Sequence, residues 1–153
     1  MLYQRPRRRR LASALVETAA VAGVFLLVLM GITEYCRFLF FLQLSENAAR
    51  EGCRFAVVNT TTDTDGDFSQ DVTGVVTQYM NNMGAKMRNF TVTVSQADSN
   101  GNIITGATPQ STPFGGFIVV QIDYDYDTIA PSLMFLGKTL HVTTKAYMCS
   151  EGN

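Results

Sequence analysis

The stretch LASALVETAAVAGVFLLVLMGI, residues 11–32, decides the fold, because Glu17 is the one charged side chain in an otherwise apolar run. At about 1.5 Å of rise per residue, a helix over this stretch is roughly 33 Å long, enough to cross a membrane once. An ionisable side chain in hydrocarbon costs about 2.5 to 3.5 kcal/mol on insertion scales. The stretch therefore predicts one membrane-spanning helix whose carboxylate has a partner or a purpose.

Five arginines, at positions 5 and 7–10, stand directly before the apolar run. Clusters of arginine next to a membrane span stay on the cytoplasmic side. We therefore expect residues 1–12 to form a basic cytoplasmic leader and the chain after Ile32 to be exported. The apolar run is longer than the core of an ordinary secretory signal, so we expect the chain to stay in the membrane.

The exported part is acidic, which excludes nucleic acid as an expected partner. Of the 12 basic residues, five are the arginines of the leader, so about seven remain in the exported part. These seven are outnumbered by 13 acidic residues, which gives the exported part a net negative charge. A chain of 153 residues is one domain by the usual size of domains, with a small exported head.

Helical periodicity continues past the membrane surface. Apolar residues recur at helical spacing as far as Val58, and Glu46 with Arg50, like Glu51 with Arg54, can pair on an exposed helix face. The pattern predicts one helix over residues 13–58, roughly 70 Å long.

The remaining residues, 59–153, are expected to form an α+β head in which a second helix packs on an antiparallel sheet of three or four strands. Turn-forming residues follow Asn59, and apolar spacing then predicts a helix from Phe68 to Met83, closed by Gly84. Alternating patterns predict strands over the ranges 90–94, 117–126 and 139–148, with a turn at 99–102 that leads into a short hairpin partner at 103–104.

Motifs at both ends of the chain resemble the TadE-like pilin family. They are ALVE at residues 14–17, GITEYCR at 31–37 and NAAREGCR at 47–54, with VVQIDY at 119–124 and TKAYM at 144–148 as weaker matches. The resemblance implies a pilin-like fold and the role of a minor pilin or pseudopilin in a tight-adherence type IV pilus or secretion apparatus.

The same resemblance implies processing by a prepilin peptidase that leaves the key glutamate as the fifth mature residue. Carried over to this chain, cleavage falls between Ala12 and Ser13, and Glu17 takes position five. Ala12 departs from the preferred glycine, and Cys36 and Cys53 stand where glycine or alanine is usual. The implied partners are the bacterial inner membrane, other pilin subunits and the assembly platform, with a periplasmic head that can enter an extracellular pilus.

Three charged residues are candidates for packing between subunits. Glu17 in a bundle of membrane helices can be neutralised by the free amine of Ser13 in a neighbouring copy. A glutamate that extends its side chain to water at the membrane edge is the alternative. Glu34 and Arg37 can pair between copies, and an equally good interpretation is a local pair on one helix.

Three cysteines in an exported chain permit a disulfide. Cys36 and Cys53 are about 25 Å apart on one helix, too far to bond. We therefore expect Cys149 to supply any bridge within the chain, with Cys53 as its partner, and three unpaired thiols are the alternative.

Catalysis and metal binding have little support. His141 is the one histidine and has no evident partner in the sequence. The aspartates at 63, 65, 67 and 71 lack the glycine and glutamate spacing of a calcium loop, and those at 123, 125 and 127 are expected on a solvated strand face. We expect no cofactor, no small-molecule substrate and no enzyme activity. The competing function is a membrane-anchored binding module that is neither cleaved nor assembled.

Overall fold

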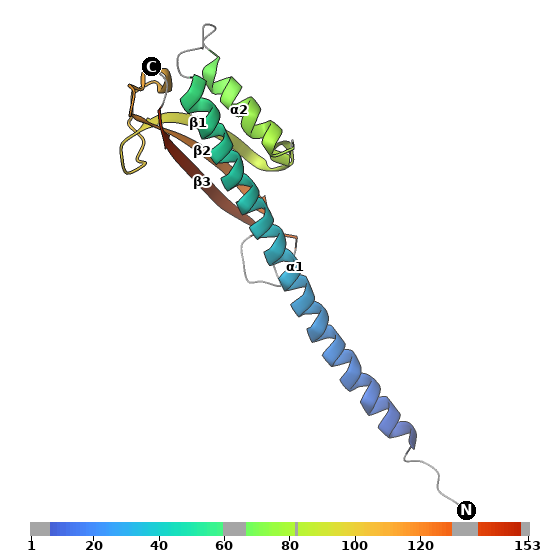
Figure 1. Ribbon diagram of the computed structural model, residues 1–153. Coiled ribbons are helices and arrows are strands. Elements are labelled where there is room, and N and C mark those ends of the chain that lie inside the picture. Colours follow the sequence, from blue (N-terminus) through green and yellow to red (C-terminus); the bar gives the residue numbers. More distant parts are fainter. Residues whose placement is uncertain (1–6, 60–66, 82, 130–137, 151–153) are drawn as a thin grey trace, which may run out of the picture.

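The computed structural model describes residues 7–59, 67–81, 83–129 and 138–150, with side chains from Ser13 onward apart from those of 85 and 86. Its elements follow in the order α1 (Arg7–Asn59), α2 (Phe68–Tyr79), η1 (Met83–Lys86), β1 (Arg88–Ala97), η2 (Pro109–Ser111), β2 (Phe117–Asp127) and β3 (Thr139–Cys149). The long helix carries a head of one further helix and a three-stranded sheet, so the α+β, pilin-like layout is confirmed (Figure 1).

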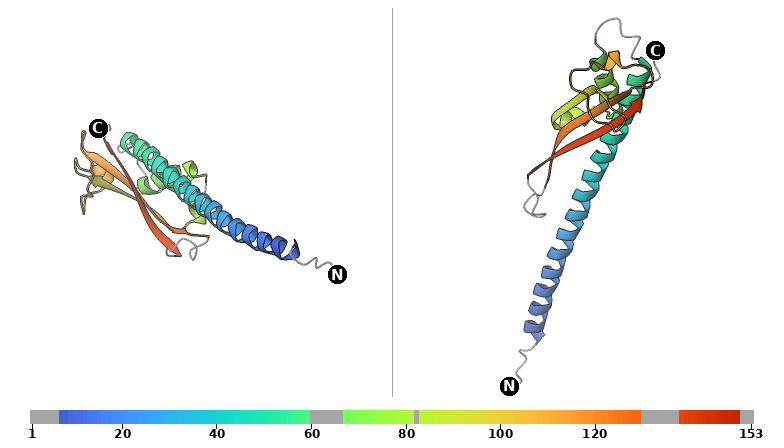
Figure 2. Two further views of the ribbon diagram at one scale, coloured as in Figure 1. Left: turned by 90° about the horizontal axis from the view of Figure 1, so that it is seen from below. Right: turned by 90° about the vertical axis from the view of Figure 1, so that its left-hand side faces the viewer.

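Helix α1 is one unbroken rod. It begins far from the head, and only its C-terminal part packs within the head (Figures 1 and 2). It begins at Arg7, earlier than the predicted Ser13, because arginine, leucine and alanine are all good helix formers. The helix is long and apolar enough to cross a membrane, and its most apolar part is not buried against the described residues. Membrane association through a single span is therefore indicated by the helix itself.

The sheet is antiparallel with β2 in the centre, in the order β1-β2-β3. Strands β2 and β3 pair without interruption from Phe117 opposite Cys149 to Asp127 opposite Thr139. Strand β1 is longer than predicted and has a bulge between Arg88 and Thr91. The expected hairpin partner at 103–104 contributes a single bridge to β1, so it does not form a fourth strand.

The last part of α1 and the whole of α2 cover one face of the sheet (Figure 1). The buried core joins small residues of α1 to valines of α2 and to the alternate residues of β2 that point the same way. Helix α2 ends at Tyr79 instead of the predicted Met83, and Asn81 has a positive φ of 52°. Asparagine tolerates that left-handed conformation, so it ends the helix early.

Candidate functional site

Glu17 lies on the free part of α1, among side chains that are all exposed. Among the side chains that the structure describes, no cation contacts its carboxylate, and the head is at the other end of the helix (Figure 1). Ser13 is also exposed, and the side chain of Ala12 lies outside the described residues. The predicted processing and packing residues are thus not covered by the chain itself, and their roles stay predictions.

Glu34 and Arg37, the other two predicted packing residues, form a local pair on α1 and also hold the head. Arg37 Nη2 lies 3.2 Å from Glu34 Oε1. The same carboxylate oxygen accepts hydrogen bonds from the Tyr126 hydroxyl at 2.8 Å and from the Ile129 amide at 3.2 Å. The guanidinium of Arg37 donates to the Tyr126 oxygen at 2.9 Å and to the carbonyl of Asp127 at 2.6 Å. We call these five residues the head clamp.

Glu34 and Tyr126, at the centre of the head clamp, are shielded from water, whereas Ile129 and Asp127 at its edge are exposed. Glu34 is only 5% exposed, and burial together with the hydrogen bond to Glu34 raises the pKa of the Tyr126 hydroxyl, which therefore stays a donor. The Arg37 guanidinium stacks over the Tyr126 ring at 4.9 Å, and Phe38 meets the same ring edge-on. The end of β2 is therefore fixed to α1 just beyond the apolar run.

The sequence indicated the Glu34–Arg37 pair as one of two alternatives but did not identify the partners of this pair at the end of β2 and just after it. Tyr126 and Ile129 are about 90 residues away in the chain, and the hydrogen bonds that join them to Glu34 depend on how the sheet packs against the helix. A tyrosine at the end of an alternating strand was the only available signal. Contact of Glu34 and Arg37 with a second copy stays a prediction.

The structure has all three cysteines as free thiols, and the bridge between Cys53 and Cys149 stays a prediction. The Cys53 thiol is fully buried and lies 3.0 Å from the carbonyl of Ala146. Burial raises its pKa to about 11. Cys149 is exposed, follows Met148, which packs on the core, and lines a surface hollow together with Val57 and Val58 of α1.

The aspartates of β2 lie on the outer face of the sheet, each with partners on neighbouring strands. Asp125 lies 2.9 Å from Nδ1 of His141 and accepts from Asn89, and these hydrogen bonds lower the pKa of its carboxyl. Thr143 donates to Asp123 at 2.6 Å. The partner of His141 depends on strand register, which the sequence did not give. The arrangement agrees with a hydrogen-bonded, solvated face.

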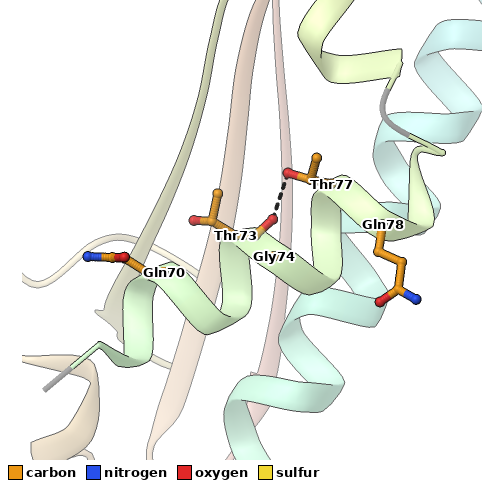
Figure 3. Close-up of a pocket in the computed structure, with 5 residues that line it drawn as sticks. All are labelled: Gln70, Thr73, Gly74, Thr77 and Gln78. Carbon is orange, nitrogen blue, oxygen red and sulfur yellow. Dashed lines mark hydrogen bonds between the residues drawn. The ribbon is translucent and has the colours of Figure 1, made fainter. Parts of the chain in front are cut away.

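Neither a metal centre nor a reaction site is built around these groups. Among the described residues no three metal-ligating side chains come together, and Asp63 and Asp65 of the weak calcium pattern lie outside the described ranges. A shallow hollow on α2, shown in Figure 3, is lined by uncharged side chains, and there the Thr77 hydroxyl donates to the carbonyl oxygen of Thr73 in its own helix. These observations give no support to catalysis.

Comparisons with known proteins agree with the motifs of the helix. Searches of curated proteins and of solved structures return no match. The family model described as TadE-like protein matches residues 12–54, which cover most of α1, including Glu17, Glu34 and Arg37. The family is a structural one associated with the Tad pilus and is not enzymatic. Over residues 12–54, the long helix of this chain is therefore similar to that of TadE-like proteins.

Proposed function

We propose that this chain is a minor pilin or pseudopilin of a Tad-type pilus or secretion apparatus, cleaved between Ala12 and Ser13 and assembled through α1. The observation that carries the proposal is the position of Glu17: a carboxylate on an apolar helix that no other part of the described chain covers. The match of residues 12–54 to the TadE-like family supports the same function.

The physical basis is the energy of an unpaired carboxylate in hydrocarbon. Glu17 is stabilised when a cation of a neighbouring helix lies beside it, and the free amine of Ser13 becomes available only after cleavage. Pairing of the two groups would set the axial position of one helix against the next. The remaining apolar side chains of this part of α1 are exposed and available for the same contact, Val21 at 64% and Phe25 at 60% among them.

We further propose that the chain resides in the bacterial inner membrane, with the arginines cytoplasmic and the head periplasmic, until it is assembled. The partners are then a prepilin peptidase, the assembly platform and other pilin subunits. The positive charge before the membrane run supports this orientation. The head fixed by the clamp would be carried outward with the helix.

The first test is the N-terminal residue and intact mass of the protein purified from its native envelope. We expect a chain that begins at Ser13. A chain that retains the arginines of residues 7–10 would contradict processing and favour the membrane-anchored binding module, for which the basic leader is a permanent anchor.

The second test is Glu17→Ala, compared with Glu51→Ala on the same helix, whose side chain is half-exposed and pairs with Arg54 at 3.5 Å. We expect Glu17→Ala to remain in the membrane fraction but to be lost from the sheared or purified apparatus. Glu51→Ala should assemble as the unmodified chain does. Normal incorporation of Glu17→Ala would refute the role of this carboxylate in assembly.

A further inference from the structure

One end of the head is level with the end of the apolar run. Helix α1 continues without a break from Ile32 to Glu34, which lies about 3 Å further along the axis. The amide of Ile129, just after β2, donates to the Glu34 carboxylate at 3.2 Å. When residues 11–32 occupy the hydrocarbon, Ile129 must therefore lie in the adjoining layer of lipid headgroups.

The side chains at this level are those found at membrane surfaces. Ile129 is 62% exposed and Tyr35, on α1 beside Glu34, is 57% exposed. Tyrosine is enriched at the boundary between lipid and water, where its ring is in the apolar layer and its hydroxyl is hydrated. Contact with lipid would explain why the large side chains of Ile129 and Tyr35 are exposed at the end of the head that is nearest to the apolar run.

Two cations, Arg37 and Lys138, lie at the same end, although the exported part is acidic as a whole. Arg37 is one-third exposed, and Lys138, whose carbonyl accepts from the Thr128 amide at 3.1 Å, is exposed. The nearby carboxylates are already paired: Glu34 is buried in the head clamp, and Asp127 lies 3.7 Å from Arg88. Arg37 and Arg88 balance these two carboxylates, so the side chains named here leave one net positive charge, that of Lys138.

We propose that this end of the head, defined by Tyr35, Arg37, Ile129 and Lys138, rests in the headgroup layer of an anionic membrane. Ile129 and Tyr35 enter the apolar boundary, while Arg37 and Lys138 meet lipid phosphates. The head clamp makes this contact rigid, because it fixes Ile129 to the helix that spans the membrane. The contact concerns the chain while it is in the membrane and does not depend on its later assembly.

The absence of tryptophan from the chain allows a direct test. Ile129→Trp places a single fluorophore at the proposed contact in the full chain, reconstituted into vesicles of phosphatidylcholine and phosphatidylglycerol with brominated acyl chains. Val21→Trp, in the apolar run, is the control for insertion. Phe114→Trp is the control for exposure, since Phe114 is 72% exposed and lies before β2, at the opposite end of the sheet from Asp127.

We expect bromine to quench Ile129→Trp and Val21→Trp strongly and Phe114→Trp hardly at all, with emission at shorter wavelength for the two quenched variants. Quenching of Ile129→Trp no stronger than that of Phe114→Trp, while Val21→Trp is quenched, would overturn the proposal and leave membrane insertion, and with it the proposed function, intact.

The contribution of charge is tested in the Ile129→Trp background by comparing Lys138→Glu with Lys145→Glu. Lys145 is also exposed, but it lies within β3. In vesicles that contain phosphatidylglycerol, we expect Lys138→Glu to lose quenching and Lys145→Glu to keep it. Equal quenching of the two variants would overturn the assignment of Lys138 to the headgroups.

Discussion

At the scale of single residues, the reactivity of the three thiols follows from where the fold places them. Cys53 is fully buried with a pKa of about 11, whereas Cys36 and Cys149 are exposed. Because the thiolate is the reactive form, Cys53 should resist alkylation at neutral pH. We expect a maleimide, without reductant, to label Cys36 and Cys149 in the folded chain and Cys53 only after unfolding, as measured by intact mass and peptide mapping.

The same measurement separates this structure from the bridge predicted from the sequence. A bond between Cys53 and Cys149 would leave Cys149 unlabelled until a reductant is added, and a chain purified from the envelope in that form would contradict the free thiols. Cys149→Ser is the control, because it should remove one label without exposing Cys53. Sequence could restrict the pairing by helix length, but it could not say to which face of β3 Cys149 points.

At the scale of elements, the packing of α1 on α2 depends on the absence of a side chain at Gly52. A Cβ atom there would lie 2.6 Å from Val76 Cγ2 and 3.5 Å from side chains of Val72 and Val120. Overpacking of this kind costs about 1 to 3 kcal/mol, more than the 0.5 to 1 kcal/mol that alanine gains over glycine in a helix. We expect Gly52→Ala to lower the Tm of the head in detergent, measured by circular dichroism.

Gly74 provides the matched control on the other helix. A Cβ atom at Gly74 meets nothing within 4 Å, and the position is exposed on α2. Gly74→Ala should therefore stabilise the head by about 0.5 to 1 kcal/mol through helix propensity alone. Equal shifts of Tm in the two variants, in either direction, would contradict close contact between the helices at Gly52.

The helices and strands were largely predictable because each has a regular pattern of burial. The alternation of β2 and β3 gave their bounds to within a residue, and the apolar run gave α1. The end of α2 was missed because its apolar spacing continues through Met80, which is buried, after the backbone has already left the helix. The hairpin partner predicted at 103–104 was wrong as a strand, because this segment pairs with β1 through a single bridge.

At the scale of the whole molecule, the apolar run of α1 is exposed and the last part of the same helix is packed in the head. The head clamp lies where these two parts of α1 meet. Sequence identified Glu17, Glu34 and Arg37 as unusual charges near the membrane, which was enough to suggest contacts but not to choose between them. The choice depends on Tyr126 and Ile129, which the sheet brings to the helix from far along the chain. Long-range contacts of this kind have no local signature, so only the structure shows them.

The clamp predicts how the head responds when it is broken. Glu34→Ala removes the acceptor of the Tyr126 hydroxyl and of the Ile129 amide, and such losses cost about 1 to 3 kcal/mol where the groups are buried. We expect faster hydrogen exchange of the Ile129 amide, measured by mass spectrometry, with little change in exchange around β1. Glu51→Ala, whose exposed pair contributes about 0 to 1 kcal/mol, should leave that exchange unchanged.

Tyr126→Phe tests whether the clamp acts as one unit. The phenol donates to Glu34 and accepts from Arg37, so its removal should weaken the same contact that Glu34→Ala breaks. Residues in one hydrogen-bond network show non-additive changes, and the double variant should therefore lose less stability than the two single losses combined. Strictly additive losses would mean that Glu34 and Tyr126 hold the head independently, and the head would then be free to hinge on α1 after either contact is lost.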